Sequence, residues 1–253
     1  MSDAKPSVPD YGNWFSARIL IILAVVAIIL AALSFVFLPA IVGAGLFVFV
    51  FGYYAYARYT FSARGGDLQA QVRALVLDHL EWYGHGHAID IGCGNGPLVI
   101  EIAKKFPDAH VTGVDYWGGK FEYSKQVCEE NAEIEGVADR VSFRRASASA
   151  LPFDDESFDA AVSNLAFHEV RDANDKREVI KEVLRVVKKD GAFAFQDIFL
   201  KRVYGDVEEL LQTIRGWGVA RVEFIDTGHV SFLPRILRVP FGFGAMGILC
   251  GRK

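Results

Sequence analysis

The sequence predicts an α/β domain with a mostly parallel sheet and helices on both faces, preceded by an apolar helical hairpin. Two observations predict the domain: strand-like and helix-like stretches alternate from about residue 67, and a glycine-rich turn follows the first of these strands. A third observation predicts the hairpin, because the chain has no Asp, Glu, Lys, Arg or His between Arg18 and Arg58. The 253 residues are enough for both parts.

The apolar stretch is too long for a single membrane-spanning helix. As one helix, residues 19–57 would extend for about 58 Å, whereas the hydrocarbon core of a bilayer is about 30 Å thick. Two helices fit, over 19–38 and 40–57, with a break at Pro39, which cannot continue a helix without a kink. We therefore predict a two-pass transmembrane hairpin over residues 19–57.

Positive charges flank both ends of the hairpin, and none lies at its turn. Lys5 and Arg18 precede it and Arg58 and Arg64 follow it, so both ends are expected in the cytoplasm. A cleaved signal peptide is disfavoured because a second apolar run follows at once. A hairpin that enters the membrane without crossing it remains an alternative, since the turn is tight and apolar. We expect a multi-pass membrane protein whose α/β domain lies on the cytoplasmic side.

The predicted organisation has four parts: a cytoplasmic N-terminal segment (1–18), the hairpin (19–57), a linker (58–66) and the α/β domain (67–253). The domain begins with a helix over 67–83, whose apolar residues recur at helical spacing. Strands are expected at 88–91, 111–115, 141–144, 159–163, 191–196, 219–225 and 244–250. Helices are expected at 97–105, about 119–135, about 174–188 and about 205–215. The last connection contains no clear helix, so the final strand is expected to run antiparallel to its neighbour.

Composition excludes several partners. The net charge of −4 and the pI of about 5.9 argue against a nucleic-acid ligand, because no basic excess is present to neutralise phosphates. The cysteines, Cys93, Cys128 and Cys250, form no CxxC pair and no Cys/His spacing typical of metal sites. We expect neither a metal nor a nucleic acid among the ligands.

The glycine-rich turn lies in the sequence AIDIGCGNGPLVI, residues 88–100. A phosphate-binding P-loop needs Lys followed by Ser or Thr after the last glycine, where this chain has Pro97 and Leu98. A dinucleotide site needs a third glycine at position 97. Asp90 would repel a pyrophosphate and suits a ligand with a cationic amine. The turn that would hold this ligand consists of Gly92, Cys93, Gly94, Asn95 and Gly96.

Asp115 ends the second predicted strand, about 20 residues after the turn. An acid at this point accepts hydrogen bonds from two ribose hydroxyls. The ligand is therefore expected to be a nucleoside that carries an amine rather than a diphosphate, and S-adenosylmethionine (SAM) has this form.

Four motifs in this order carry a resemblance to a known family: Asp90-x-Gly-x-Gly-x-Gly, Asp115, LPFDDESFDAAVSNLAFHEV (151–170) and VLRVVKKDGAFAFQDIF (183–199). Over roughly residues 67–253 the chain resembles class I SAM-dependent methyltransferases, and within them the subgroup of quinone-biosynthesis methyltransferases. The resemblance implies a Rossmann-like seven-stranded sheet in the order 3-2-1-4-5-7-6, with the last strand antiparallel.

The resemblance also implies roles for individual residues. Asp90 and the glycine turn would hold the methionine end of the cofactor, partly through backbone groups, and Asp115 would hold the ribose. The other expected cofactor contacts are Tyr116, Ser147, Ala148 and Asn164. Ser147 stands where the family often has an acid near the adenine amine. His168 is the expected general base if the methyl acceptor starts protonated, because imidazole titrates near neutral pH.

These expectations combine into one function: a membrane-anchored methyltransferase that transfers a methyl group from SAM to a lipophilic small molecule or lipid. Its partners would be the bilayer and the small-molecule acceptor. The alternatives are a membrane-tethered SAM-binding protein without catalysis, a methyltransferase for a soluble or protein acceptor, and an NAD-dependent oxidoreductase, which Asp90 and Pro97 disfavour.

Overall fold

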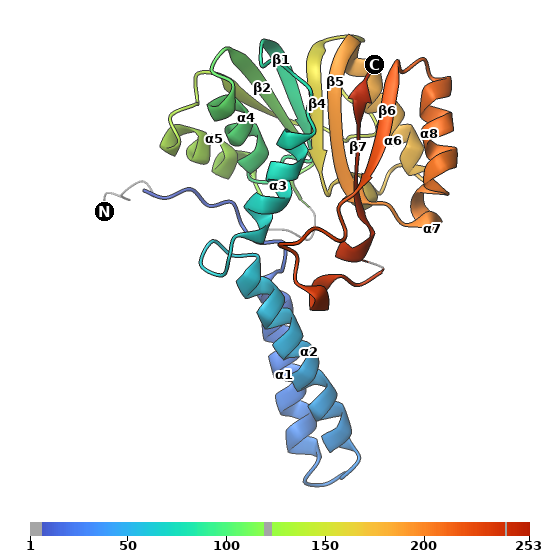
Figure 1. The fold of residues 1–253 in the computed structure, drawn as a ribbon. Helices are drawn as coiled ribbons and strands as arrows, with labels where there is room; N and C mark the ends of the chain where they lie inside the picture. Colours follow the sequence, from blue (N-terminus) through green and yellow to red (C-terminus); the bar gives the residue numbers. More distant parts are fainter. Residues whose placement is uncertain (1–6, 119–122, 241) are drawn as a thin grey trace. The chain divides into compact units, whose positions relative to one another are not determined.

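The computed structural model describes residues 7–118, 123–240 and 242–253, which form two compact units (Figure 1). The first unit consists of residues 13–71. The second combines residues 7–12 with residues 72–253. The boundary between the units therefore falls inside a helix, and the short stretch before the hairpin belongs to the larger unit.

The smaller unit is a helical hairpin of α1 (Ala17–Leu33) and α2 (Ala40–Thr60). The first helix ends at Leu33, earlier than the predicted residue 38, and residues 34–38 form the turn before Pro39. The second helix continues to Thr60, three residues into the predicted linker. Among the described residues, α2 is long and apolar enough to cross a bilayer, while α1 is apolar but only 17 residues long.

The larger unit is built on one seven-stranded sheet, in the order β3-β2-β1-β4-β5-β7-β6 (Figure 1). Neighbours among β1 to β5 pair in parallel, and β7 pairs antiparallel with both β5 and β6. This confirms the predicted strand order and the antiparallel last strand. The strands are β1 (Gly86–Ile91), β2 (Ala109–Asp115), β3 (Val141–Arg145), β4 (Phe158–Asn164), β5 (Val187–Ile198), β6 (Arg221–Asp226) and β7 (Met246–Arg252).

Helices cover both faces of the sheet, as predicted. The α-helices are α3 (Leu68–Asp78), α4 (Pro97–Lys105), α5 (Lys125–Ile134), α6 (Lys176–Val186), α7 (Lys201–Tyr204) and α8 (Val207–Gly216). The predicted helix over 67–83 ends at Asp78, and beyond it the Trp82 ring packs against Phe106 instead. The predicted helix over 119–135 is described from Ser124, its N-cap, onward, and residues 119–122 lie outside the described part.

The core alternates along each central strand with a period of two residues. On β1, Ile89 and Ile91 pack on the face covered by α6 and α8, whereas Ala88 packs on the opposite face with α4 and α5. Asp90 shares the side of Ala88, and only 1% of its surface is exposed. Strand alternation thus places a carboxylate inside the apolar layer beneath α4.

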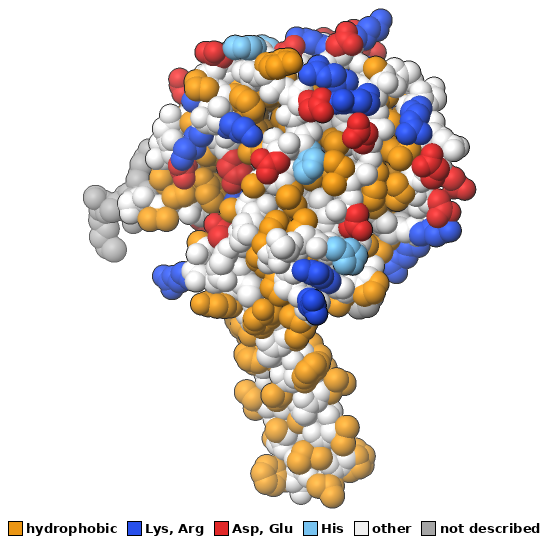
Figure 2. Space-filling view, in the orientation of Figure 1, with side chains coloured by type: hydrophobic (Ala, Val, Ile, Leu, Met, Phe, Trp, Pro, Cys, Tyr) orange, Lys and Arg blue, Asp and Glu red, His pale blue; other side chains and the backbone are white. Residues whose placement is uncertain are grey.

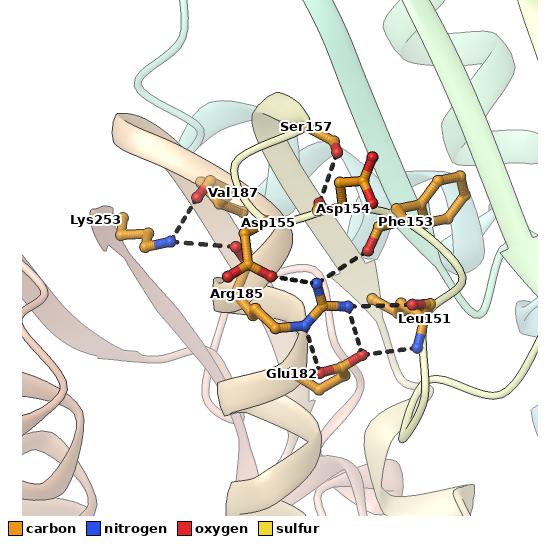
Figure 3. Close-up of polar contacts among 9 residues, drawn as sticks. All are labelled: Leu151, Phe153, Asp154, Asp155, Ser157, Glu182, Arg185, Val187 and Lys253. Carbon is orange, nitrogen blue, oxygen red and sulfur yellow. Dashed lines mark hydrogen bonds and ion pairs between the residues drawn. The ribbon is translucent and has the colours of Figure 1, made fainter.

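The loop that leads into β4 is fixed by one arginine (Figure 3). From α6, Arg185 donates to the carbonyls of Leu151 and Phe153, at 3.1 and 2.9 Å, and to Asp155 Oδ1 at 2.6 Å. Glu182, one turn earlier, binds the same guanidinium at 2.9 Å and accepts from the Leu151 amide at 2.8 Å. These bonds fix the backbone directly after Ser147 and Ala148.

Candidate functional site: a cavity at the carboxyl ends of the strands

A cavity of about 460 Å³ opens where β1, β2 and β4 end. Ligands of parallel α/β sheets bind at this edge, and the volume is in the ordinary range for small-molecule sites. The residues that line the cavity are Ile91, Gly92, Val114, Asp115, Tyr116, Trp117, Gly118, Tyr123, Ala146, Ser147, Ala148, Leu165, Ala166, Glu169, Val170, Arg171 and Asp172.

The glycine turn forms one wall because its backbone passes close to another loop. Gly92 has a φ of +76°, and a Cβ on it would lie 2.1 Å from the Cβ of Ala166. Only glycine fits such a position without displacing the chain. The amides of Gly92 and Cys93 both donate to the Val114 carbonyl, at 2.7 and 3.1 Å, which ties the turn to β2. The turn is therefore held in place, and the amides of Gly92 and Cys93 are not free to bind a ligand.

Asp115 stands at the centre of the cavity wall, at the end of β2. Its Oδ2 accepts from the Gly94 amide and its Oδ1 from the Trp117 amide, each at 2.9 Å. Burial raises the pKa of Asp115, and hydrogen bonds from the amides of Trp117, Gly94 and Tyr116 oppose this rise. A carboxylate has about four acceptor sites, so these amides leave Asp115 able to accept from a ribose hydroxyl.

Asp90 lies at the end of β1, just before the turn, and its buried carboxylate favours a ligand with a positive charge. Its Oδ2 is buried without a hydrogen-bond partner among the described residues. Burial raises the pKa of Asp90 well above its usual range, and the charges of Asp115 and Glu101 raise it further, while Arg73 lowers it. An incompletely paired buried carboxylate is costly, so a nearby ligand cation would stabilise it. The carboxylates thus fit a nucleoside that carries an amine, as the sequence predicts for SAM.

The structure brings together part of the predicted site. Gly92, Asp115, Tyr116, Ser147 and Ala148 line the cavity. The predicted residues that do not line the cavity are Asp90, Cys93, Gly94, Asn95, Gly96, Asn164 and His168.

Two of these residues have structural surroundings that the sequence does not reveal. Cys93 is buried, with its sulfur next to Gly113, and burial raises the pKa of its thiol well above the usual value. Asn95 is 2% exposed, and its side chain accepts from the Ser124 amide at 3.1 Å and donates to the Asp10 carbonyl at 3.1 Å. The Asn95 side chain therefore joins chain segments and does not point into the cavity.

Ser147 has an acidic partner that comes from another loop. Asp172 lines the same cavity, and hydrogen bonds from Ser147 and Ser149 lower the pKa of Asp172. The carboxylate that is absent at position 147 is thus supplied at the same wall by the segment after β4. Sequence reasoning missed Asp172, because nothing in the spacing links residues 25 positions apart in two loops.

His168 lies next to the cavity, in the 3₁₀ turn Phe167–Glu169. Its Nδ1 contacts Asp197 Oδ1, and its backbone amide donates to Asp197 Oδ2 at 2.9 Å. The Asp197 carboxylate is 1% exposed and also accepts from the Tyr204 hydroxyl at 2.7 Å and from the Ile198 amide at 2.7 Å. Burial, followed by the charge of Asp197, raises the pKa of Tyr204, so this phenol keeps its proton and donates it.

This arrangement fixes the orientation of the imidazole. A carboxylate can only accept, so the contact requires the proton on Nδ1 and leaves Nε2 as the basic nitrogen. Sequence reasoning selected His168 and missed Asp197, although Asp197 lies in the motif at 183–199. The sequence feature that could have indicated Asp197 is its place as a polar residue at the carboxyl end of a predicted strand.

Comparison with known proteins bears on the kind of domain that carries this cavity. Residues 89–195 match the family model of a methyltransferase domain. The chain is 29% identical over 120 residues to the ubiquinone/menaquinone biosynthesis C-methyltransferase UbiE of Geotalea daltonii, covering 47% of this chain and 48% of the relative. It is 32% identical over 145 residues to the sterol 24-C-methyltransferase ERG6B of Gibberella zeae, covering 55% of this chain and 36% of the relative.

Among solved structures, the geranyl diphosphate C-methyltransferase of Streptomyces coelicolor A3(2), in complex with Mg²⁺, geranyl diphosphate and S-adenosyl-L-homocysteine, matches with a TM-score of 0.60. The match covers 75% of this chain and 81% of that chain at 16% identity, which shows a shared fold. The matches to curated relatives span about half of their length or less. The family match, the strand order and the carboxylates at the cavity together identify a SAM-dependent methyltransferase domain in this chain.

Proposed function

We propose that this protein is a membrane-anchored methyltransferase that transfers a methyl group from SAM to a lipophilic small molecule. The observation that carries the catalytic part is the cavity itself, with Asp115 on its wall and the His168–Asp197 pair beside it. The observation that supports the membrane anchor is the exposed apolar surface of the hairpin.

The residues around the cavity divide the cofactor between them. Asp115 would accept from the ribose hydroxyls, and Gly92 would offer its carbonyl to the amine of the methionine end, with Asp90 as the compensating charge. Tyr116, Ser147 and Ala148 would contact the adenine, and Asp172 would accept from its amino group. Asn164, whose buried Oδ1 has no partner among the described residues, supports the methionine end from β4.

His168 prepares the acceptor. The bound SAM supplies a methyl group on a positively charged sulfur, which is already activated for direct displacement. The chain's contribution is alignment of the acceptor atom with the methyl carbon, together with removal of the acceptor's proton if it has one. Asp197 holds the Nδ1 proton of His168, so Nε2 takes the acceptor's proton and Asp197 stabilises the resulting imidazolium.

The hairpin supports a membrane location. Large apolar side chains are exposed along both helices and at the turn, where Phe35 is 92% and Val36 90% exposed (Figure 2). The amides of residues 34–37 all donate to carbonyls at the end of α1, so these four donors need no water. Both the exposed apolar side chains and the paired amides of the turn are compatible with a hydrocarbon environment. The flanking cations favour two passes with the methyltransferase domain in the cytoplasm.

The relatives support a lipophilic acceptor. The names of matched proteins include sterol, quinone and geranyl diphosphate methyltransferases, whose named substrates are apolar in part or whole. A membrane anchor concentrates the enzyme where such molecules dissolve.

The function is tested by following the methyl group. The purified full chain in detergent is incubated with methyl-labelled SAM and a membrane-lipid extract, and labelled products are separated into lipid, soluble and protein fractions. We expect label in the lipid fraction and none with Asp115→Ala. Label only in the soluble or protein fraction would contradict the lipophilic acceptor. SAM binding without any labelled product would contradict catalysis.

A further inference from the structure

A short stretch of chain before the hairpin packs against residues of the cavity wall from behind. We call residues 10–12 (Asp10, Tyr11 and Gly12) the N-terminal strap. These residues belong to the same compact unit as the cavity, although about 60 residues of hairpin and linker separate them from the rest of that unit.

The strap is held through its backbone by two buried asparagines. Asn131 of α5, 1% exposed, accepts from the Asp10 amide at 2.8 Å and donates to the Asp10 carbonyl at 2.9 Å. The same Asn131 amide group donates to the carbonyl of Asn95 in the glycine turn at 3.0 Å. Asn95 in turn donates to the Asp10 carbonyl. Withdrawal of the strap would leave two buried amides short of partners, which is unfavourable.

The other two strap residues secure it at its sides. The Tyr11 hydroxyl donates to Glu135 Oε1 at 3.0 Å, and the Arg73 guanidinium lies 5.9 Å from the centre of the Tyr11 ring. Burial and the neighbouring Glu135 raise the pKa of Tyr11, so the phenol remains a donor. Arg73 is itself 5% exposed and bound to Glu101 at 2.8 Å, so the ring rests on a fixed surface.

Gly12 connects the strap to the cavity. A Cβ on Gly12 would lie 2.8 Å from the ring of Tyr123, so the glycine backbone lies directly against this ring. Tyr123 lines the cavity, and its other side faces Gly94, where a Cβ would be 3.4 Å from the ring. The strap therefore supports two cavity elements from behind, the glycine turn and Tyr123.

From these contacts we infer that the N-terminal strap positions the glycine turn and Tyr123 for the cofactor, and that strap docking and SAM binding strengthen each other. Coupling between two binding events is reciprocal, so a cofactor that needs the turn in place must also stabilise the docked strap. The inference rests on the proposed use of this cavity by SAM.

The test uses substitutions in the strap, where Gly12 is exposed and Tyr11 packs at the edge of the core. Gly12→Ala places a methyl group against the Tyr123 ring at a φ of +67°. Tyr11→Ala removes the bond to Glu135 and the contact with Arg73. The matched control is Gly136→Ala, because Gly136 has a similar φ of +72° with nothing within 4 Å of its Cβ. Thermal unfolding checks that each full-length variant is folded.

Two measurements are made on each protein: the Kd for SAM by calorimetry, and hydrogen exchange of the Asp10 amide with and without S-adenosylhomocysteine. We expect both strap variants to bind SAM roughly tenfold more weakly, within the usual size of such couplings, and the control to bind as the parent does. We expect the ligand to slow exchange at Asp10 in the parent chain. Unchanged affinity in both strap variants, or exchange at Asp10 that ignores the ligand, would overturn the inference. Failure of the parent chain itself to bind SAM would instead overturn the proposed cofactor site.

Discussion

At the scale of single residues, three carboxylates at the ends of β1, β2 and β5 have distinct surroundings. Asp90 is buried with an oxygen that lacks a partner among the described residues, Asp115 accepts from backbone amides and lines the cavity, and Asp197 accepts from a histidine, a phenol and backbone amides. In the proposed function the first compensates a ligand charge, the second binds the ligand and the third orients a base. The sequence predicts the first two from motif spacing, but Asp197 needs the fold, because β5 is adjacent to β4 only in space.

The affinity for SAM should depend on pH through Asp115. In the proposed site the ionised carboxylate accepts from the ribose, and burial raises the pKa of Asp115 above the usual value of an aspartate. The affinity should therefore fall as the pH drops through this raised pKa. Calorimetry between about pH 7.5 and pH 4.5 measures the effect. Asp115→Asn should lower the affinity at neutral pH by about 10- to 100-fold, the value of one or two hydrogen bonds to a charged group, and flatten the curve. Parallel curves for parent and variant would assign the pH dependence to another group.

Asp197→Asn should lower kcat by about 100-fold or more, while the Kd for SAM stays the same. The amide no longer stabilises the imidazolium of His168 or fixes its tautomer, and Asp197 does not line the cavity. The pH profile of kcat separates this role from a structural one, because loss of the base changes the acidic limb of the profile. Tyr204→Phe keeps the carboxylate and serves as the milder control. A parental kcat in Asp197→Asn would exclude His168 as the base.

At the scale of elements, α6 fixes the loop that carries Ser147 and Ala148 of the cavity lining. The Arg185 guanidinium joins this loop to Glu182, and the hydrogen bond from Arg185 lowers the pKa of Glu182 (Figure 3). The periodicity of the sequence predicts α6 but not this use of its polar side, because the partners of Arg185 are backbone carbonyls more than 30 residues away.

Arg185→Leu should destabilise the domain by about 1–3 kcal/mol, the range for losing several hydrogen bonds that solvent partly screens. Because the native pKa of Glu182 lies below its value in the unfolded chain, this contribution is complete at neutral pH and is lost as the pH falls through the native pKa. Urea unfolding at about pH 7 and pH 4 measures both effects. Arg177→Leu, which breaks a more exposed pair with Asp175, should have a smaller effect. Equal losses for the two variants would show that the loop contacts add nothing.

The hairpin can be tested as an element of its own. Ile28 and Phe49 are 68% and 71% exposed, so the paired change Ile28→Lys and Phe49→Lys costs little in water and about 3 kcal/mol per lysine in hydrocarbon. We expect the double variant to leave the membrane fraction while it still binds SAM. Tyr83→Lys, at an 85% exposed position of the larger unit, controls for added charge. Retention of the double variant in membranes after carbonate washing would contradict the anchor.

At the scale of the whole molecule, the fold was largely predictable and the site only in part. Strand positions and the order of the sheet follow from alternating patterns and from the motifs, because central strands are apolar and helices amphipathic. The helix ends at Leu33 and Asp78 were harder, since they depend on a turn and on tertiary contacts. The partnerships of Asn95 with Asp10 and of Ser147 with Asp172 were not predictable, because they join segments that lie far apart along the chain.

The strap also has a consequence for the order of events during synthesis. Asp10 leaves the ribosome early, but its partner Asn131 follows 121 residues later. The hairpin is therefore complete, and can meet a membrane, well before the cavity has all of its walls. The proposed anchor is thus made before the catalytic site is complete, so in the proposed function membrane insertion can precede the assembly of the cofactor cavity.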